Sequence, residues 1–306
     1  MSETTLSVFK TYKLYVGGKF PRSESGRVYE VSAATSTAGA AGKGQWLANA
    51  PLGTRKDTRD AVLAARAAVK GWAGTTAYNR GQVLYRIAEM LQGRREQFVV
   101  EVSLAEGIGH KKASALVDAA IDRWVWYAGW TDKVAQIAGS SNPVAGPFFN
   151  LSTPEPSGVI GVVAPQSGTG FSFLGLVSVI APAIAAGNTV VVAAATDAPL
   201  PALSLGEVLA TSDLPGGVVN VISGKTADIA PTLASHQDVN GLDLAGAIAA
   251  EGPGAAVELE VLAADTLKRV IRPAADQAAL DWTNAPGTER LLSFLETKTV
   301  WHPMGI

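Results

Sequence analysis

Gly158-Val159-Ile160-Gly161-Val162-Val163 is the stretch that decides the fold, because it is apolar at every position rather than at alternate ones. Three further apolar runs follow it, at residues 190–192, 218–222 and 239–244. Segments of helix length separate these runs, at residues 174–186, 199–210 and 226–235. Continuous apolar strands that alternate with helices indicate a parallel sheet covered on both faces. The sequence therefore predicts an α/β fold.

Parallel sheets of this kind bind ligands in the crevice beyond the carboxyl ends of their strands. The segments that follow the four predicted strands are residues 165–170, 193–196, 223–226 and 245–247. We expect any binding site of this domain to lie there.

Composition excludes several chemistries. The 306 residues contain no cysteine, which rules out disulfides, thiolate metal ligands, iron–sulfur clusters and a nucleophilic thiol. The three histidines, His110, His236 and His302, are far apart and show no metal-binding spacing, so no metal site is expected. A net charge of -2 gives no electrostatic basis for binding nucleic acid or an anionic membrane.

Two stretches bear on targeting, the N-terminus and the apolar centre of the chain. Met1-Ser2-Glu3-Thr4-Thr5 is polar and does not resemble a signal peptide. Residues 156–196 carry no charge, but glycine, proline and polar residues interrupt them before they reach the roughly 20 apolar residues of a spanning helix. The prediction is a cytoplasmic protein without a membrane segment.

The flanking regions show other patterns. Residues 57–137 have apolar positions at helical spacing, with Asp57 as the predicted cap of the first helix and the aromatic residues of 124–130 as core. Residues 13–20 predict a β-hairpin around a Gly-Gly turn, and residues 294–302 predict a strand. Residues 251–279, rich in Ala, Gly and Pro, predict a connector.

Three local motifs resemble phosphate-binding or catalytic motifs in part. Ser223-Gly224-Lys225-Thr226 lacks the first glycine of a P-loop, since that position is Val219. Gly168-Thr169-Gly170 fails the dinucleotide fingerprint at Phe173, although a glycine-rich turn could still accept a phosphate. Glu258 and Glu260 would share one face of a strand, and a solvated surface pair is the favoured interpretation.

Several longer motifs, in unbroken order over roughly residues 10 to 250, resemble aldehyde dehydrogenases. They are Leu14-Tyr15-Val16-Gly17-Gly18-Lys19, Pro51-Leu52, Ala64-Ala65-Arg66-Ala67-Ala68 with Gly71-Trp72, Tyr127-Ala128-Gly129-Trp130, Gly158-Val159-Ile160-Gly161-Val162-Val163-Ala164-Pro165, Ile180-Ala181-Pro182-Ala183-Ile184-Ala185-Ala186-Gly187-Asn188-Thr189 with the strand after it, and Leu214-Pro215-Gly216-Gly217-Val218-Val219-Asn220-Val221. The tail Leu295-Glu296-Thr297-Lys298-Thr299-Val300 resembles the family's C-terminal oligomerisation strand. The resemblance implies a Rossmann-like cofactor domain that binds NAD or NADP.

The departures from the family pattern concern the chemistry. Gln166-Ser167 stands where the family has the Asn that stabilises the oxyanion, and Ser167 could donate one hydrogen bond there. Ala193-Ala194-Ala195-Thr196 replaces the Lys and Glu that hold the adenosine ribose, and Leu244-Ala245-Gly246-Ala247-Ile248 lacks the hydroxyls beside the pyrophosphate. Glu258-Leu259-Glu260-Val261 retains only a faint similarity to the general-base motif. After that point the catalytic domain with its Cys is expected to be missing.

These observations predict a truncated, non-catalytic homologue. Its expected parts are a hairpin arm and linker (1–56), a helical segment (57–140), a degenerate cofactor domain (141–250), and a connector with the oligomerisation strand (251–306). We expect no catalytic residue, no metal and no cofactor, and partners that are further copies or a full-length aldehyde dehydrogenase paralogue. The alternative is an NAD(P)-dependent aldehyde oxidoreductase active only within a hetero-oligomer, which either completes an active site with a partner or uses Ser167 and Glu258 differently. A third possibility is a sensor that binds a nucleotide without turnover. The vestigial cofactor-binding positions are Pro165, Gln166, Ser167, Thr196, Gly224 and Gly246.

Overall fold

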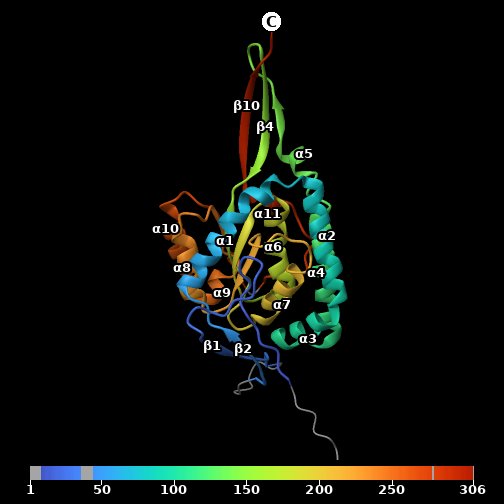
Figure 1. The fold of residues 1–306 in the computed structure, drawn as a ribbon, viewed down its shortest axis with the longest axis vertical. Helices are drawn as coiled ribbons and strands as arrows, with labels where there is room; N and C mark the ends of the chain where they lie inside the picture. The colour runs from blue at the N-terminus through green and yellow to red at the C-terminus, as the bar shows by residue number, and fades with distance from the viewer. Residues whose placement is uncertain (1–7, 36–43, 278, 306) are drawn as a thin grey trace, which may run out of the picture.

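A five-stranded parallel sheet forms the centre of the molecule. The computed structural model describes residues 8–35, 44–277 and 279–305. Figure 1 shows an α/β body from which a narrow β arm projects. The sheet has the strand order β7-β6-β5-β8-β9, and all four neighbouring pairs are parallel, which confirms the predicted fold class. Its strands are β5 (Val159–Val163), β6 (Thr189–Ala193), β7 (Val219–Ile222), β8 (Gly241–Asp243) and β9 (Arg269–Ile271).

Two separate cores explain why the strands are apolar at every position. Alternate side chains of a strand point to opposite faces of a sheet. Ile160 and Val162 enter one core, together with α6 (Leu176–Ala185) and α7 (Leu200–Leu209). Val159 and Val163 enter the other core, with α1 (Arg55–Gly74) and α8 (Thr226–Ser235).

The predicted helical region forms five helices. Thr54, not Asp57, caps α1: the Thr54 hydroxyl accepts from the amide of Asp57, and the Asp57 carboxylate accepts from the amide of Thr54. Asp57 was mistaken for the cap because it is the acidic half of this reciprocal box. Trp72 and Trp124 are buried, as the core interpretation of the tryptophans predicted for Trp124. The remaining helices are α2 (Ala77–Gly93), α3 (Arg95–Glu106), α4 (His110–Ala128) and α5 (Val134–Ala138).

The predicted N-terminal hairpin is reduced to a tight turn. Gly17 and Gly18 both have positive φ, 60° and 77°, as a two-residue hairpin turn of this hand requires. Val16 and Lys19 pair across it, and the amide of Leu14 donates to the carbonyl of Pro21 at 3.1 Å. Tyr15 exchanges two backbone hydrogen bonds with Val221 and so extends the sheet beyond β7. A true antiparallel pair lies further on, between β1 (Val28–Ser32) and β2 (Trp46–Pro51).

The predicted connector is folded and contributes to the sheet. It contains α10 (Ala255–Ala264) and β9, which pairs with β8, and it begins where α9 (Ala247–Glu251) ends. The sheet therefore extends past residue 250, where the cofactor domain was expected to end. Glu258 and Glu260 lie on α10 rather than on a strand, and Glu260 pairs with Arg272.

The arm consists of β3 (Ser140–Asn142), β4 (Phe148–Pro156) and β10 (Leu295–Pro303). β10 pairs antiparallel with β4 over nine residues, which confirms the predicted C-terminal strand. Residues 272–294, here called the linking segment, connect β9 to β10 and include α11 (Glu289–Ser293). Within the described ranges, no helix combines the length and apolar character needed to cross a bilayer.

Candidate functional site

The sequence-predicted site residues lie beyond the carboxyl ends of four parallel strands. Pro165, Gln166 and Ser167 follow β5, Thr196 follows β6, Gly224 follows β7 and Gly246 follows β8. Because neighbouring parallel strands end at the same edge, these segments meet there.

Thr196 makes the central contacts of this edge. Its amide donates to Oε1 of Gln166 at 2.9 Å, and its hydroxyl donates to the carbonyl oxygen of Gly224 at 3.1 Å. Its own carbonyl accepts a hydrogen bond from the hydroxyl of Tyr29 at 3.1 Å. The structure thus brings Gln166, Thr196 and Gly224 together, and their polar groups are bound to one another.

Gly246 lies against the loop after β5. A Cβ on this residue would lie 1.9 Å from the carbonyl oxygen of Ala164 and 3.1 Å from Cγ of Gln166. Its amide donates to the carbonyl of Val163 at 3.0 Å. Close backbone packing therefore accounts for a glycine here, independently of any ligand.

The linking segment covers the loop that carries Ser167. The amide of Thr169 donates to Leu280 O at 3.2 Å, and the amide of Trp282 donates to Thr169 O at 3.1 Å. The indole Nε1–H of Trp282 points to the carbonyl oxygen of Ser167 at 3.4 Å. The Ser167 hydroxyl is buried and has no hydrogen-bond partner among the described residues. The linking segment therefore holds this loop through backbone and indole hydrogen bonds.

Two arginines hold the linking segment in place. Arg123, on α4 and 7% exposed, donates to Trp282 O at 3.1 Å and to Asn284 O at 2.7 Å. Arg290 pairs with the buried carboxylate of Asp243 at the end of β8. Sequence reasoning missed Arg123, Trp282 and Arg290, because nothing in their local pattern indicates which distant carbonyls or carboxylates they contact.

A pocket of about 340 Å³ opens beside Thr196. Gln166, Asp197, Lys225 and Glu251 supply polar lining. The carboxylate of Glu251 accepts from the amide of Ala227, in the first turn of α8, at 3.0 Å. A helix N-terminus is a favourable place for an anion, and here a side chain of the protein takes that position.

These contacts test whether the pocket fits a dinucleotide. Phosphate and ribose groups need free backbone amides or charged side chains. The amides of Thr196 and Ala227 are already bound to Gln166 and Glu251, and the lining has two carboxylates for one lysine. Two amides at this edge are therefore not free to bind a dinucleotide, and Lys225 is the one cationic side chain among the described lining residues.

In the described part of the chain, the three histidines lie apart from one another and from any group of carboxylates that could bind a metal ion. His110 contacts Glu96 on the surface at 2.8 Å, His236 accepts from the amide of Asp238, and His302 lies on β10. Across the residues that the structure describes, no three His, Asp or Glu side chains are grouped as metal ligands.

Comparison with known proteins gives a consistent family match. The sequence model described as "Aldehyde dehydrogenase family" matches residues 32–271. Retinal dehydrogenase 2 of Gallus gallus is 32% identical over 241 residues, which are 78% of this chain and 44% of that protein. Cytosolic 10-formyltetrahydrofolate dehydrogenase of Pongo abelii is 31% identical over 242 residues, 77% of this chain and 25% of that protein.

Solved structures show the same relationship. The NAD-dependent aldehyde dehydrogenase from Sinorhizobium meliloti superposes with a TM-score of 0.75 at 25% identity, covering 85% of this chain and 49% of that one. The NAD+ complex of an aldehyde dehydrogenase from Bacillus cereus superposes with a TM-score of 0.76 at 25% identity, covering 85% and 50%. The chain spans half or less of the length of these relatives.

Proposed function

This chain belongs to the aldehyde dehydrogenase family, and from that premise we propose that it is a non-catalytic structural or regulatory subunit. It assembles with further copies of itself or with a full-length aldehyde dehydrogenase, and the arm is the assembling element. The observation that carries this proposal is the set of apolar side chains that the arm presents to solvent.

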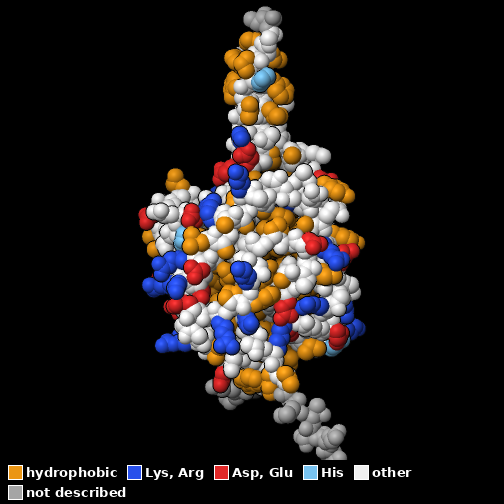
Figure 2. Space-filling view, viewed as in Figure 1, with side chains coloured by type: hydrophobic (Ala, Val, Ile, Leu, Met, Phe, Trp, Pro, Cys, Tyr) orange, Lys and Arg blue, Asp and Glu red, His pale blue; other side chains and the backbone are white. Residues whose placement is uncertain are grey.

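The arm exposes apolar side chains on both of its faces. Leu151 and Val300 are cross-strand partners and 37% and 47% exposed, and Trp301, at 57%, packs edge-on against Phe148. Figure 2 shows hydrophobic side chains along the projecting arm. A ribbon of two or three strands without a covering layer is marginally stable in water, and apolar patches of this kind mark interaction sites. A partner surface would bury both faces.

The site contacts support the non-catalytic part of the proposal. Leu280 and Trp282 are hydrogen-bonded to the loop that carries Ser167, and the amide of Thr196 is hydrogen-bonded to Gln166. An enzyme site needs free groups aimed at the reacting atoms. We therefore propose that the protein needs no cofactor, and that it acts in the cytoplasm.

Native mass measurement tests the assembly. We expect the purified chain to form oligomers alone or on mixing with a full-length aldehyde dehydrogenase of its host. Trp301→Ser should abolish them. Val257→Ser, which changes a 62% exposed residue of α10, is the matched control and should leave them intact. A monomer under both conditions contradicts the proposal.

The alternative function, an NAD(P)-dependent aldehyde oxidoreductase active only in a hetero-oligomer, draws on the pocket beside Thr196 and its lysine, Lys225. Calorimetric titration with NAD and NADP decides between the two. Affinity typical of dehydrogenases, followed by aldehyde oxidation in the mixed oligomer, would favour the alternative. Absence of binding at millimolar dinucleotide supports the non-catalytic subunit.

A further inference from the structure

A second pocket, of about 410 Å³, lies between α3, the β1–β2 pair and the start of α7. It shares Asp197 and Ala198 with the pocket beside Thr196 and is otherwise built from different residues. Much of its wall is apolar, formed by Val31, Leu47, Val100, Leu104, Leu200 and Pro201. Its volume is within the range of small-molecule sites, which are largely apolar with a few polar groups that orient the ligand.

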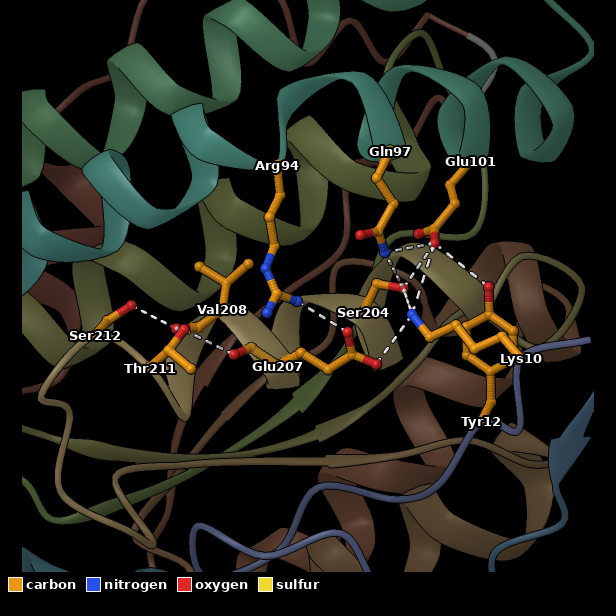
Figure 3. Close-up of polar contacts among 10 residues, drawn as sticks. All are labelled: Lys10, Tyr12, Arg94, Gln97, Glu101, Ser204, Glu207, Val208, Thr211 and Ser212. Carbon is orange, nitrogen blue, oxygen red and sulfur yellow. Dashed lines mark hydrogen bonds and ion pairs between the residues drawn. The ribbon is translucent and has the colours of Figure 1, made fainter.

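Glu101 is the orienting group of this pocket. It lies on α3, its side chain is 11% exposed, and it is one of the lining residues. Its Oε1 accepts hydrogen bonds from Ser204 at 2.7 Å, from Gln97 at 3.1 Å and from Tyr12 at 3.3 Å (Figure 3). Its Oε2 is buried and has no partner among the described residues. A buried carboxylate oxygen without a donor is costly, so this atom is a position where a ligand donor gains free energy.

The charged residues that line the pocket determine whether it favours a cation or an anion. Three carboxylates line it, those of Glu96, Glu101 and Asp197, and the described lining residues include no Lys or Arg. Lys10 approaches Glu101 only on the Oε1 side, at 4.0 Å, and lies closer to Glu207, at 3.0 Å. Figure 3 shows Lys10 between these two carboxylates. The pocket therefore retains negative charge.

We propose that this pocket binds an organic ammonium ion, with the apolar body against Val100 and Leu104 and the ammonium group donating to Oε2 of Glu101. Oε2 is buried, so the carboxylate has to turn about its soft terminal torsion to meet the ammonium group, and the donors Ser204, Gln97 and Tyr12 have to follow Oε1 in that turn. Hydrogen bonds between two charged groups are stronger than neutral ones, which favours an amine over an alcohol of the same shape. This site is independent of the assembly proposed above.

Three probes of one shape test the charge requirement. They are 2-phenylethylamine, 2-phenylethanol and phenylacetate, titrated by calorimetry into the full chain at low ionic strength. We expect the amine to bind at least about tenfold more tightly than the alcohol, and phenylacetate not to bind. Equal binding of amine and alcohol overturns the proposal.

Two variants locate the site. Glu101→Gln keeps the shape and removes the charge, so it should weaken the amine at least about tenfold and leave the alcohol unchanged. Glu89→Gln, on the surface of α2, is its control. Val100→Trp fills the pocket from a position that is 47% exposed and should abolish binding of both probes, while Leu63→Trp, at a 57% exposed position of α1, should not.

If Glu101→Gln does not fold, Val100→Trp still tests the proposal. In that case amine binding that survives Val100→Trp places the amine elsewhere and overturns the proposal, and binding that is lost supports it. Where both variants fold, amine affinity unchanged in either one overturns it.

Discussion

Trp282 lies directly on Gly175: a Cβ on that glycine would be 3.0 Å from the indole carbons. Gly175 ends the π-helix η1 (Phe171–Gly175) that precedes α6, and Trp282 belongs to the linking segment more than a hundred residues later. The indole is 9% exposed and also reaches the carbonyl of Ser167. The side chain of Trp282 thus connects the linking segment to the loop after β5.

Trp282→Ala should lower the free energy of unfolding by about 3 kcal/mol, because it removes a large buried side chain and leaves a cavity beside η1. Urea denaturation measures the change. Tyr85→Ala, at a 49% exposed position of α2 outside the arm, is the control and should change the stability by less than about 0.5 kcal/mol. A loss at Trp282 no larger than at Tyr85 would show that the linking segment is not part of the core.

Gly246→Ala should destabilise the protein by about 2 kcal/mol or more, since its Cβ would overlap the carbonyl oxygen of Ala164. Gly254→Ala is the matched control. It has helical φ and ψ of -76° and -22° and no atom near its Cβ position, so alanine should be neutral or slightly stabilising. Thermal unfolding of both variants separates the two cases, and equal midpoints would contradict the packing role of Gly246.

Thr54→Ala should cost about 1 kcal/mol, because it removes the side-chain cap of α1 and one half of the reciprocal pair with Asp57. The half-buried Thr75, at the other end of the same helix, donates its hydroxyl to Gly71 O, and Thr75→Ala should cost less than about 0.5 kcal/mol. Denaturant midpoints compare the pair; the reverse order would exclude Thr54 as the cap.

Glu106 gives a pH dependence of defined sign. Burial raises the pKa of this carboxyl, although hydrogen bonds from Ser172 and Gly170 oppose the shift. A carboxyl whose pKa is higher in the folded than in the unfolded state binds more protons when folded. It therefore stabilises the protein at low pH, and that contribution is lost as the pH rises through its unfolded pKa toward the folded one.

Glu106→Gln should remove this component, so the unfolding free energy of the variant should fall less than that of the parent between pH 4 and pH 7. Glu101→Gln should act in the same direction, since burial is also the main cause of the raised pKa of Glu101. Chemical denaturation at several pH values measures both profiles. Parallel profiles for the parent and Glu106→Gln would contradict the assignment.

The sequence predicted the sheet well because its signals are local. Every residue of β5 is buried, and such strands are apolar throughout whichever partner they pair with. Helix α8 also begins and ends at the predicted residues, because the pattern that indicates it lies within its own sequence. The connector was misjudged because β9 is only three residues long, and so short a strand has no periodicity of its own.

The sequence predicted where the candidate site lies, but not whether its polar groups are free to bind a ligand. The rule that parallel strands share one carboxyl edge places Gln166, Thr196 and Gly224 together from their sequence positions alone. Whether their polar groups are free depends on which atoms lie within hydrogen-bond distance. That Gln166 binds the amide of Thr196, and that Trp282 covers Ser167, are contacts between residues 30 and 115 positions apart.

The sequence by itself therefore determined the α/β class, the family resemblance and the missing charged groups at the strand ends, because residue type and periodicity carry this information. The tertiary structure alone decided that the linking segment contacts the loop at Ser167 and that the Glu251 carboxylate lies at the N-terminus of α8. It also decided that one oxygen of Glu101 has no donor among the described residues. Hydrogen bonds and burial depend on distance in space, and the chain order does not encode those distances locally.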